Sequence, residues 1–379
     1  MFNYLRRLDS FLARIAIYIF PPKPFCGDIN SLRIKKILCM RFWGLGNLVL
    51  IYPLIYKIKE RFPEAQIAFV TFDANKGFLE KNKAIDEIIY FKFTTSLFLI
   101  IKQFTSLVAK LRKEKLDLLI NFETFNNAGA FFSYLTKASL RVGLTNFSEG
   151  MFYTHPVKND LSKHISGAFS DLLRPLGINS PYQYYNFRSE TEGRGKIESL
   201  LKQYGVNRFI CVHPGTSINF IGKRYREEQW SSLVNLLIDR YGLPVFFTGT
   251  EQEKNLADAI LARVQRKEKV FNLAGKLTLW EFVEFLRKSF LLISSDTGSV
   301  HFAASLGVNV AVFYGPTSPR RFGSLSKNSL LFYQNMKCSP CVGVGYLNRA
   351  CKNKYKCLDF SPREILSSIS ERFFDAQKN

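Results

Sequence analysis

One pattern recurs in the second half of the chain: a short apolar run ends in a turn of small polar residues or glycine, and a helix-like segment follows. Residues 208–212 (RFICV), 244–249 (PVFFTG) and 290–294 (FLLIS) are such runs. Runs of this length predict buried strands, and strands that alternate with helices form parallel sheets with right-handed crossovers. Ligands of open parallel sheets bind at the carboxyl ends of the strands. The pattern therefore predicts an α/β fold with a binding site at these turns.

The same alternation runs through the first half of the chain. Its expected strands lie at residues 37–40, 66–71, 87–91 and 117–121, and its expected helices at 52–61 and 97–112. A chain of 379 residues is longer than one hydrophobic core usually supports. Two doubly wound domains are therefore expected.

The turn Asp296-Thr-Gly-Ser-Val-His301 follows the run at 290–294 and begins a helix-like segment. A helix that begins directly after a strand presents free backbone N–H groups and a positive dipole end at one point. His301 adds a donor in the first turn of that helix. The turn is therefore suited to a phosphate group, although an ordinary strand-to-helix turn capped by Asp296 has the same sequence pattern.

A matching turn lies upstream, after the run at 208–212. It reads His213-Pro-Gly-Thr-Ser217 and is followed by Lys223, Arg224 and an amphipathic segment. Glu253 stands just after the run at 244–249, at the start of a further helix. These residues would meet the Asp296 turn at one edge of the predicted sheet.

Together these segments resemble glycosyltransferase family 9, the heptosyltransferases that build the inner core of lipopolysaccharide. The resemblance extends from about Ile34 to Cys357 and follows the order of the family's motifs. The segments that carry it are Ile37-Leu-Cys-Met-Arg41, Gly44-Leu-Gly-Asn47, Pro53, Arg61-Phe-Pro63, His213-Pro-Gly-Thr-Ser217, Lys223-Arg-Tyr225, Thr248-Gly249, Asn272-Leu-Ala-Gly275 and Asp296-Thr-Gly-Ser-Val-His301.

The resemblance implies the GT-B fold, in which two facing Rossmann-like domains hold the active site in the cleft between them. We expect an acceptor-binding domain at residues 30–190 and a nucleotide-sugar-binding domain at 205–360, with a linker near 189–195. The last segment, 361–379, is expected to be a helix that crosses back onto the first domain.

The resemblance also assigns the donor residues. Thr216 and Ser217, beside Gly215, would contact the diphosphate, and Lys223 would pair with phosphate oxygens. Glu253 would hydrogen-bond the ribose, although a solvated residue in a helix's first turn is an equal alternative. The sugar and diphosphate would be held by Asp296, Thr297, Gly298 and His301.

No Asp-x-Asp motif occurs in the chain. Transferases that use a divalent ion to neutralise a leaving diphosphate usually carry one. Here backbone N–H groups, Lys223, Arg224 and His301 would meet that charge, since preorganised donors and cations stabilise developing negative charge. No catalytic metal is therefore expected.

The catalytic base departs from the family pattern. In many members the first loop ends in Gly-Asp, and the aspartate deprotonates the acceptor hydroxyl, whereas this loop ends in Gly46-Asn47. An asparagine cannot accept a proton at neutral pH, so Asn47 would only position the acceptor. Glu123, at the end of a first-domain strand, is the preferred substitute, and Asp73 is the second choice. A helix-capping role for Glu123 is the structural alternative.

Four of the seven cysteines cluster within residues 338–357, namely Cys338, Cys341, Cys351 and Cys357. A Cys-x2-Cys pair with two further cysteines nearby suits a tetrahedral zinc or iron site. This segment also resembles the cysteine-rich segment of many family members and the iron finger of relatives that modify autotransporter proteins. Free thiols are the alternative, and disulfides are disfavoured in a reducing cytoplasm.

The formal net charge of +22 implies an acidic partner. We expect no nucleic acid, because no nucleic-acid-binding module is recognised and the basic residues are scattered. Within residues 1–25, apolar residues recur at helical spacing with arginines between them, and the helix stops at Pro21 and Pro22. Its uninterrupted apolar stretch is far shorter than the ~20 residues that span a bilayer. We interpret it as a helix on the anionic inner leaflet, or as one packed on the protein itself.

The sequence thus predicts an inverting glycosyltransferase with a nucleotide-diphosphate sugar as donor, ADP-heptose by resemblance. The acceptor would be an acidic glycolipid, a lipopolysaccharide core. The enzyme would be cytoplasmic and peripheral on the inner face of the inner membrane of a Gram-negative bacterium. The alternatives are transfer to a protein acceptor, which the cysteine segment suggests, and a non-catalytic nucleotide-sugar-binding scaffold, which Asn47 suggests.

Overall fold

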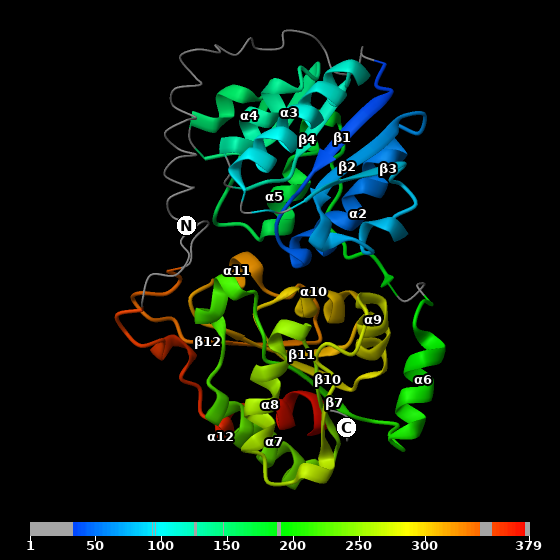
Figure 1. Cartoon of the computed structure of the whole chain (residues 1–379). Coiled ribbons are helices and arrows are strands. Elements are labelled where there is room, and N and C mark those ends of the chain that lie inside the picture. Colours follow the sequence, from blue (N-terminus) through cyan, green and yellow to red (C-terminus); the bar gives the residue numbers. More distant parts are fainter. Residues whose placement is uncertain are drawn as a thin grey trace. The chain divides into compact units, whose positions relative to one another are not determined.

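The computed structural model describes residues 33–92, 94, 96–124, 127–146, 148–187, 191–341 and 351–375. The chain divides into two compact units, residues 1–183 and 184–379, and each is described by itself (Figure 1). The division falls after Gln183, slightly before the linker expected at 189–195. The predicted helix within residues 1–25 lies outside the described residues.

The first unit is a six-stranded parallel sheet in the order β3-β2-β1-β4-β5-β6. This order changes direction between β1 and β4, which is the switch point where doubly wound sheets bind ligands. Its elements are β1 (Lys36–Met40), α2 (Leu45–Arg61), β2 (Gln66–Phe72), η2 (Asp73–Asn75), η3 (Leu79–Lys81), β3 (Glu87–Phe91), α3 (Leu97–Glu114), β4 (Leu118–Asn121), α4 (Asn127–Leu135), β5 (Leu140–Thr145), η4 (Ser148–Phe152), β6 (His155–Lys158), α5 (Ile165–Asp171) and η5 (Arg174–Leu176).

Helix α2 begins seven residues before the expected position. Gly44, at φ 86°, forms its N-cap, a backbone conformation that glycine adopts without strain. Residues 48–55 are all buried, so the helix stays folded although Pro53 removes one of its hydrogen bonds. The sequence pattern predicts the helix only at 52–61, because its first turns have no polar face from which a helical period can be recognised.

The second unit is also a six-stranded parallel sheet, in the order β12-β11-β10-β7-β8-β9. Strands β10 and β7 are neighbours in register, with Ser294 opposite His213. The elements are α6 (Arg194–Gln203), β7 (Ile210–His213), η7 (Ile218–Lys223), α7 (Glu227–Tyr241), β8 (Val245–Phe247), η8 (Glu251–Glu253), α8 (Lys254–Ala262), η9 (Lys267–Lys269), β9 (Val270–Asn272), α9 (Leu279–Lys288), β10 (Leu291–Ser295), α10 (Gly298–Ser305), β11 (Asn309–Tyr314), α11 (Pro319–Phe322), β12 (Ser329–Tyr333), η10 (Lys356–Leu358), α12 (Pro362–Ile369) and η11 (Ser370–Phe374).

The last helix, which we expect to cross back onto the first domain, packs on α7 in the second unit. The side chains of Ile365, Ile369 and Phe373 are buried in the hydrophobic core of this unit together with residues of α7. Tyr241 of α7 stacks on Phe374 with ring centroids 3.6 Å apart. The apolar face of α12 and η11 is therefore used in the second unit.

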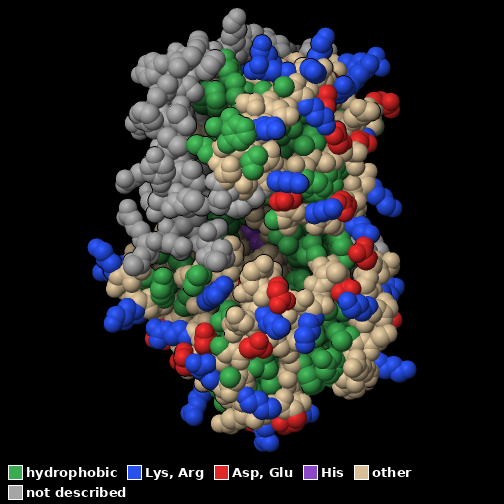
Figure 2. Space-filling model, in the orientation of Figure 1, with side chains coloured by type: hydrophobic (Ala, Val, Ile, Leu, Met, Phe, Trp, Pro, Cys, Tyr) green, Lys and Arg blue, Asp and Glu red, His purple; other side chains and the backbone are tan. Residues whose placement is uncertain are grey.

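On the face shown in Figure 2, lysine and arginine side chains are spread over both units with acidic side chains between them. Within the described ranges, no helix combines the length and the apolar character that crossing a membrane requires.

Candidate functional site

The carboxyl edge of the second sheet is built around a buried ion pair. Asp296 directly follows β10, and its residue exposure is only 8%. Its Oδ2 atom accepts hydrogen bonds from Lys223 Nζ at 2.8 Å and from Thr317 Oγ1 at 2.6 Å. Three segments that are far apart in the sequence are thus fixed at one carboxylate.

A chain of hydroxyl groups joins the Asp296 turn to the end of β7. Thr297 Oγ1 lies 2.7 Å from Ser299 Oγ, which lies 2.9 Å from Ser294 Oγ. Ser294 Oγ donates to the His213 carbonyl at 3.2 Å, and Ser295 Oγ donates to the Pro214 carbonyl at 3.0 Å. The structure therefore brings together the two turns that the sequence analysis paired.

Helix α10 begins directly at the Asp296 turn, as predicted. Thr297 is its N-cap, and the Thr297 side chain makes no capping hydrogen bond, so the positive end of the helix stays available to an anion. His301 is buried in this helix, and its Nδ1 atom lies 3.1 Å from the Tyr184 hydroxyl. Burial raises the pKa of Tyr184 to about 12, so the phenol stays protonated at neutral pH. The Tyr184 contact fixes the orientation of the imidazole ring.

Glu253 lies in a recess formed by two glycines. Its Oε2 atom accepts from the backbone N–H and the hydroxyl of Thr250, at 2.8 and 3.0 Å. A Cβ atom on Gly215 would come within 2.1 Å of Glu253 Oε1, and one on Gly249 would come within 3.1 Å of Glu253 Cβ. The two glycines therefore make room for a carboxylate that is only 9% exposed.

His213 lies in the same recess. Its Nδ1 atom is 3.1 Å from Thr248 Oγ1. Burial lowers the pKa of His213, and the nearby negative charge of Glu253 opposes this shift. At neutral pH the ring is therefore neutral and polar rather than cationic.

The loop after β7 contains residues with different contacts, namely Thr216, Ser217 and Arg224. The Thr216 hydroxyl donates to the Phe220 carbonyl at 2.9 Å, and Arg224 donates to the hydroxyl and the carbonyl of Thr216 at 3.2 and 2.9 Å. These bonds hold the loop between β7 and α7. Ser217 is exposed at the tip of the same turn.

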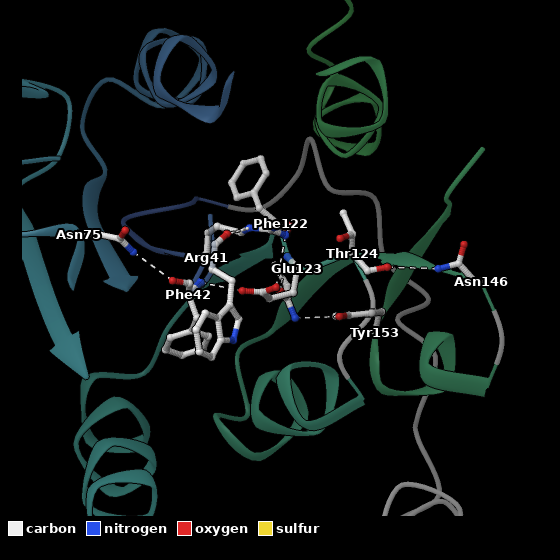
Figure 3. A network of polar contacts seen from close by, with 10 residues as sticks. Arg41, Phe42, Asn75, Phe122, Glu123, Thr124, Asn146 and Tyr153 are labelled. Atoms are coloured by element: carbon white, nitrogen blue, oxygen red, sulfur yellow. Dashed lines mark hydrogen bonds and ion pairs between the residues drawn. The ribbon is translucent and has the colours of Figure 1, made fainter. Parts of the chain in front are cut away.

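The carboxyl edge of the first sheet contains a second buried ion pair (Figure 3). Glu123 Oε2 lies 3.3 Å from Arg41 Nη1, with side-chain exposures of 6% and 5%. Glu123 Oε1 accepts the backbone N–H of Phe42 at 2.6 Å. The Arg41 guanidinium also donates to the carbonyls of Phe122 and Trp43, each at 2.8 Å. Burial lowers the pKa of Arg41, and the charge of Glu123 opposes that shift.

The glycine loop and Asp73 lie at this same edge. Gly44 begins α2, and the half-buried Asn47 lies in the first turn of that helix. Asn75 donates to the Phe42 carbonyl at 3.0 Å and so supports the start of the loop (Figure 3). Asp73, directly after β2, is exposed, whereas both oxygens of Glu123 are engaged.

Several residues of these sites were not singled out from the sequence. In the first unit these are Arg41, which pairs with Glu123, and Asn75, which binds the Phe42 carbonyl. In the second unit they are Thr317 and Tyr184, which lie in segments without a recognisable motif. The sequence does contain one indication of such a pair. Arg41 directly follows a predicted buried strand, and a buried charged residue needs a partner of opposite charge.

The four clustered cysteines differ in exposure. Cys338 and Cys341 are exposed, Cys351 is half-buried and Cys357 is buried. Burial, and after it the neighbouring thiols of Cys341, Cys351 and Cys338, raise the pKa of the Cys357 thiol to about 11. Asn353 donates to Cys338 Sγ at 3.1 Å, and the Tyr355 N–H to Cys351 Sγ at 3.3 Å. In the part of the chain that the structure describes, no three metal-binding side chains are close enough to hold an ion.

Comparisons with known proteins agree with this architecture. Lipooligosaccharide heptosyltransferase 2 of Haemophilus ducreyi is 23% identical over 310 residues, which cover 78% of this chain and 88% of the relative. The solved structure of a family 9 glycosyl transferase from Veillonella parvula matches with a TM-score of 0.72 at 20% identity, covering 91% of this chain and 99% of its own. The structure of the E. coli ADP-heptose lps heptosyltransferase II matches with a TM-score of 0.70 at 18% identity, covering 91% and 100%. The predicted GT-B fold class is confirmed by these two structures and by the two parallel sheets.

A sequence model of glycosyltransferase family 9 (heptosyltransferase) matches residues 104–351. The matched range covers well over half of the chain and contains all of the second-unit edge described above, from His213 to Thr317. The predicted family and enzyme class are therefore confirmed: the chain belongs to glycosyltransferase family 9 and is a transferase.

Proposed function

We propose that this transferase moves a heptose from ADP-heptose onto a core sugar of lipopolysaccharide with inversion at the transferred carbon. The names of the relatives support this choice, since one is a lipooligosaccharide heptosyltransferase and another an ADP-heptose enzyme. The observation that carries the proposal is the preorganised edge of the second sheet, where Asp296, Lys223 and the start of α10 converge. The proposal locates the chain at the inner face of the inner membrane of a Gram-negative bacterium, where donor and glycolipid acceptor would meet.

The donor diphosphate would bind at this edge. Lys223 has three N–H donors, so it can hold Asp296 and a phosphate oxygen at the same time. The N–H groups at the start of α10, His301 and Arg224 would supply further donors to the negative charge that develops on the leaving diphosphate. Thr297 and Gly298 would bring the backbone close to the ligand, and Ser217 would contact it with its exposed hydroxyl. These groups meet the charge without a divalent ion.

Glu253 would bind the ribose of the donor. One of its carboxylate oxygens is occupied by Thr250, and the other lies against Gly215, where a side chain would otherwise stand. Paired ribose hydroxyls are donors that a fixed carboxylate oxygen accepts well. Thr216 would shape the adjoining loop rather than leave its own bonds.

Inversion requires a base that takes the proton of the acceptor hydroxyl, and we propose Asp73 for this role. The sequence had placed Glu123 first. Both oxygens of Glu123 are already bound, one to Arg41 and the other to the Phe42 N–H. If Glu123 accepted a proton, Arg41 would be left as a buried cation without its counter-charge, which is costly. Asp73 is exposed at the same edge. Asn47 would position the acceptor hydroxyl, and Glu123 would fix the loop that carries it.

We also propose that Cys338, Cys341, Cys351 and Cys357 hold a structural zinc or iron ion. The donor set fits a soft metal because all four groups are thiols, two of which already accept N–H bonds at sulfur. The structure does not arrange them as a closed set of ligands.

The test is turnover combined with analysis of the product. Purified protein is incubated with ADP-heptose and with lipopolysaccharide from a strain that lacks the gene, and the glycolipid is analysed by mass spectrometry. A gain of one heptose mass supports the proposal. ADP release without a glycolipid product points to another acceptor, such as a protein, and donor binding without any turnover would leave only a binding role.

A further inference from the structure

The outer end of α3 carries a group of exposed apolar side chains. Leu97, Phe98, Leu99 and Ile101 are 61%, 73%, 45% and 53% exposed, and we call them the α3 tip. The contacts of this helix with the core begin one turn later, at Phe104, and continue with Leu107, Val108 and Leu111. The α3 tip is therefore not part of the hydrophobic core that holds the rest of the helix.

Basic residues continue the solvent face of α3 behind the tip. Lys102 lies one turn after Phe98, at the i+4 spacing that puts two side chains on one face of a helix. Lys113 lies further along the same face. Phe98, Lys102 and Lys113 are all exposed. Neither lysine has an ion-pair partner among the described residues, and no acidic residue lies in the first turn of α3. The face thus combines an apolar end with uncompensated positive charge.

The direction of the chain places the α3 tip at the edge of the sheet that holds the acceptor residues. Strand β3 is parallel to β2, β2 to β1 and β1 to β4, so their carboxyl ends share one edge. Helix α3 follows the carboxyl end of β3, which ends at Phe91. Its first turn therefore lies at the edge formed by the carboxyl ends of β1 and β4, the strands that lead into Arg41 and Glu123.

We propose that the α3 tip inserts into the interface of an anionic lipid bilayer. Apolar side chains at the end of a helix, with lysines set back along the same face, match the acyl and headgroup layers of a membrane surface. The lysines supply the charge complementarity to anionic headgroups. The contact would hold the acceptor edge of the first unit against the membrane in which a glycolipid acceptor is anchored. This goes beyond the proposed function, which requires no particular surface to face the lipid.

The test uses the full-length protein and a reporter placed at the tip. Phe98→Trp is compared with Leu161→Trp, a substitution at another exposed leucine of the first unit that is 56% exposed. Each variant is mixed with phosphatidylcholine vesicles containing about 30% phosphatidylglycerol and brominated lipid. Quenching of the added tryptophan in Phe98→Trp, beyond that of the unmodified protein and of Leu161→Trp, is expected. Absence of this extra quenching while the protein sediments with vesicles overturns the proposal, and so does failure of the protein to bind vesicles.

Removal of the apolar side chains gives a second measurement. The triple variant Leu97→Ser, Phe98→Ser, Ile101→Ser should partition about tenfold or more weakly onto these vesicles, whereas Leu161→Ser should not change. Lys102→Gln should weaken binding about fivefold at low salt and less at high salt. If the triple variant instead abolishes self-association in sedimentation velocity and leaves vesicle binding intact, the tip binds a second copy and the proposal is wrong.

Turnover separates this inference from the proposed function. On a lipid-free oligosaccharide acceptor the triple variant should keep the turnover of the unmodified protein, since no residue of the α3 tip belongs to the donor or acceptor groups. On vesicle-embedded acceptor its rate should fall about as much as its binding. An unmodified protein that binds vesicles through the tip but transfers no heptose would overturn only the proposed function.

Discussion

The two sheet edges use buried ion pairs for different purposes. In the second unit, the Lys223–Asp296 pair lies among hydroxyl groups and beside the start of a helix, so both charges remain positioned for a ligand. In the first unit, the Arg41–Glu123 pair forms its other hydrogen bonds with backbone groups of the protein, at Phe42, Phe122 and Trp43. The comparison shows that a buried charge is not by itself a sign of chemistry. A buried charged group can bind a ligand only if some of its hydrogen-bonding atoms are not already bound to the protein. If all of them are bound to the protein, the group stabilises the fold.

The sharpest test of this comparison replaces each of the two acidic residues of the first unit by its amide, one at a time. Asp73→Asn should lower kcat by about 10²–10⁴-fold, the usual value of a general base, and leave the melting temperature unchanged because Asp73 is exposed. Initial rates with saturating ADP-heptose and thermal melts measure both quantities. A loss below about fivefold would show that the base is elsewhere.

Glu123→Gln serves as the matched variant. The amide still accepts the Phe42 N–H but leaves Arg41 as a buried unpaired cation, which costs about 3–5 kcal/mol of unfolding free energy. The melting temperature should therefore fall, and the remaining folded enzyme should keep most of its turnover. A stable Glu123→Gln protein that loses kcat a hundredfold would make Glu123 the base and restore the assignment made from the sequence.

The donor edge should respond strongly to loss of its central carboxylate. Asp296→Ala removes the group that orients Lys223 and Thr317, and we expect a loss of about 10²–10³-fold in turnover, the size seen when one preorganised electrostatic contact is removed. Circular dichroism should show an intact fold, because the residue lies at a turn rather than in the core. Asp296→Asn is the control, since it keeps the shape and one acceptor oxygen and should lose less. Normal turnover by Asp296→Ala would exclude the proposed donor site.

A milder test addresses the glycine beside Glu253. Gly215→Ala would place a Cβ atom 2.1 Å from Glu253 Oε1 and so displace the carboxylate that we assign to the ribose. We expect the KM for the donor to rise about tenfold, with kcat changed less. Gly195→Ala in α6 meets nothing within 4 Å and serves as the control, with unchanged KM. An unchanged donor KM in Gly215→Ala would mean that Glu253 does not contact the donor.

The difference between the edges also explains what the sequence could predict. The strand–turn–helix segments at His213 and Asp296 are local, so their residues could be placed on one edge from order and periodicity alone. The Arg41–Glu123 pair joins residues 82 positions apart, and no local pattern records that Glu123 is already occupied. Helix α2 was predicted seven residues too short, because its fully buried first turns have no helical alternation. The apolar face of α12 fits either unit equally well as a pattern, and only the packing on α7 decides between them.

The cysteine segment is expected to affect transfer least, because none of its side chains is assigned to the donor or the acceptor. It only packs against the donor edge, where the Cys341 N–H donates to the Pro316 carbonyl at 3.0 Å. Purified protein should contain about one zinc or iron ion per chain by elemental analysis, and Cys338→Ser should lose it. Cys211→Ser, at a buried cysteine of β7, should retain the ion, since that thiol is held by Thr248 rather than by the cluster. EDTA added during the assay should leave turnover within about twofold, because the diphosphate is met by Lys223 and N–H groups rather than by a metal. Neither metal in the protein, together with four titratable thiols in the cluster, would show that these cysteines are free.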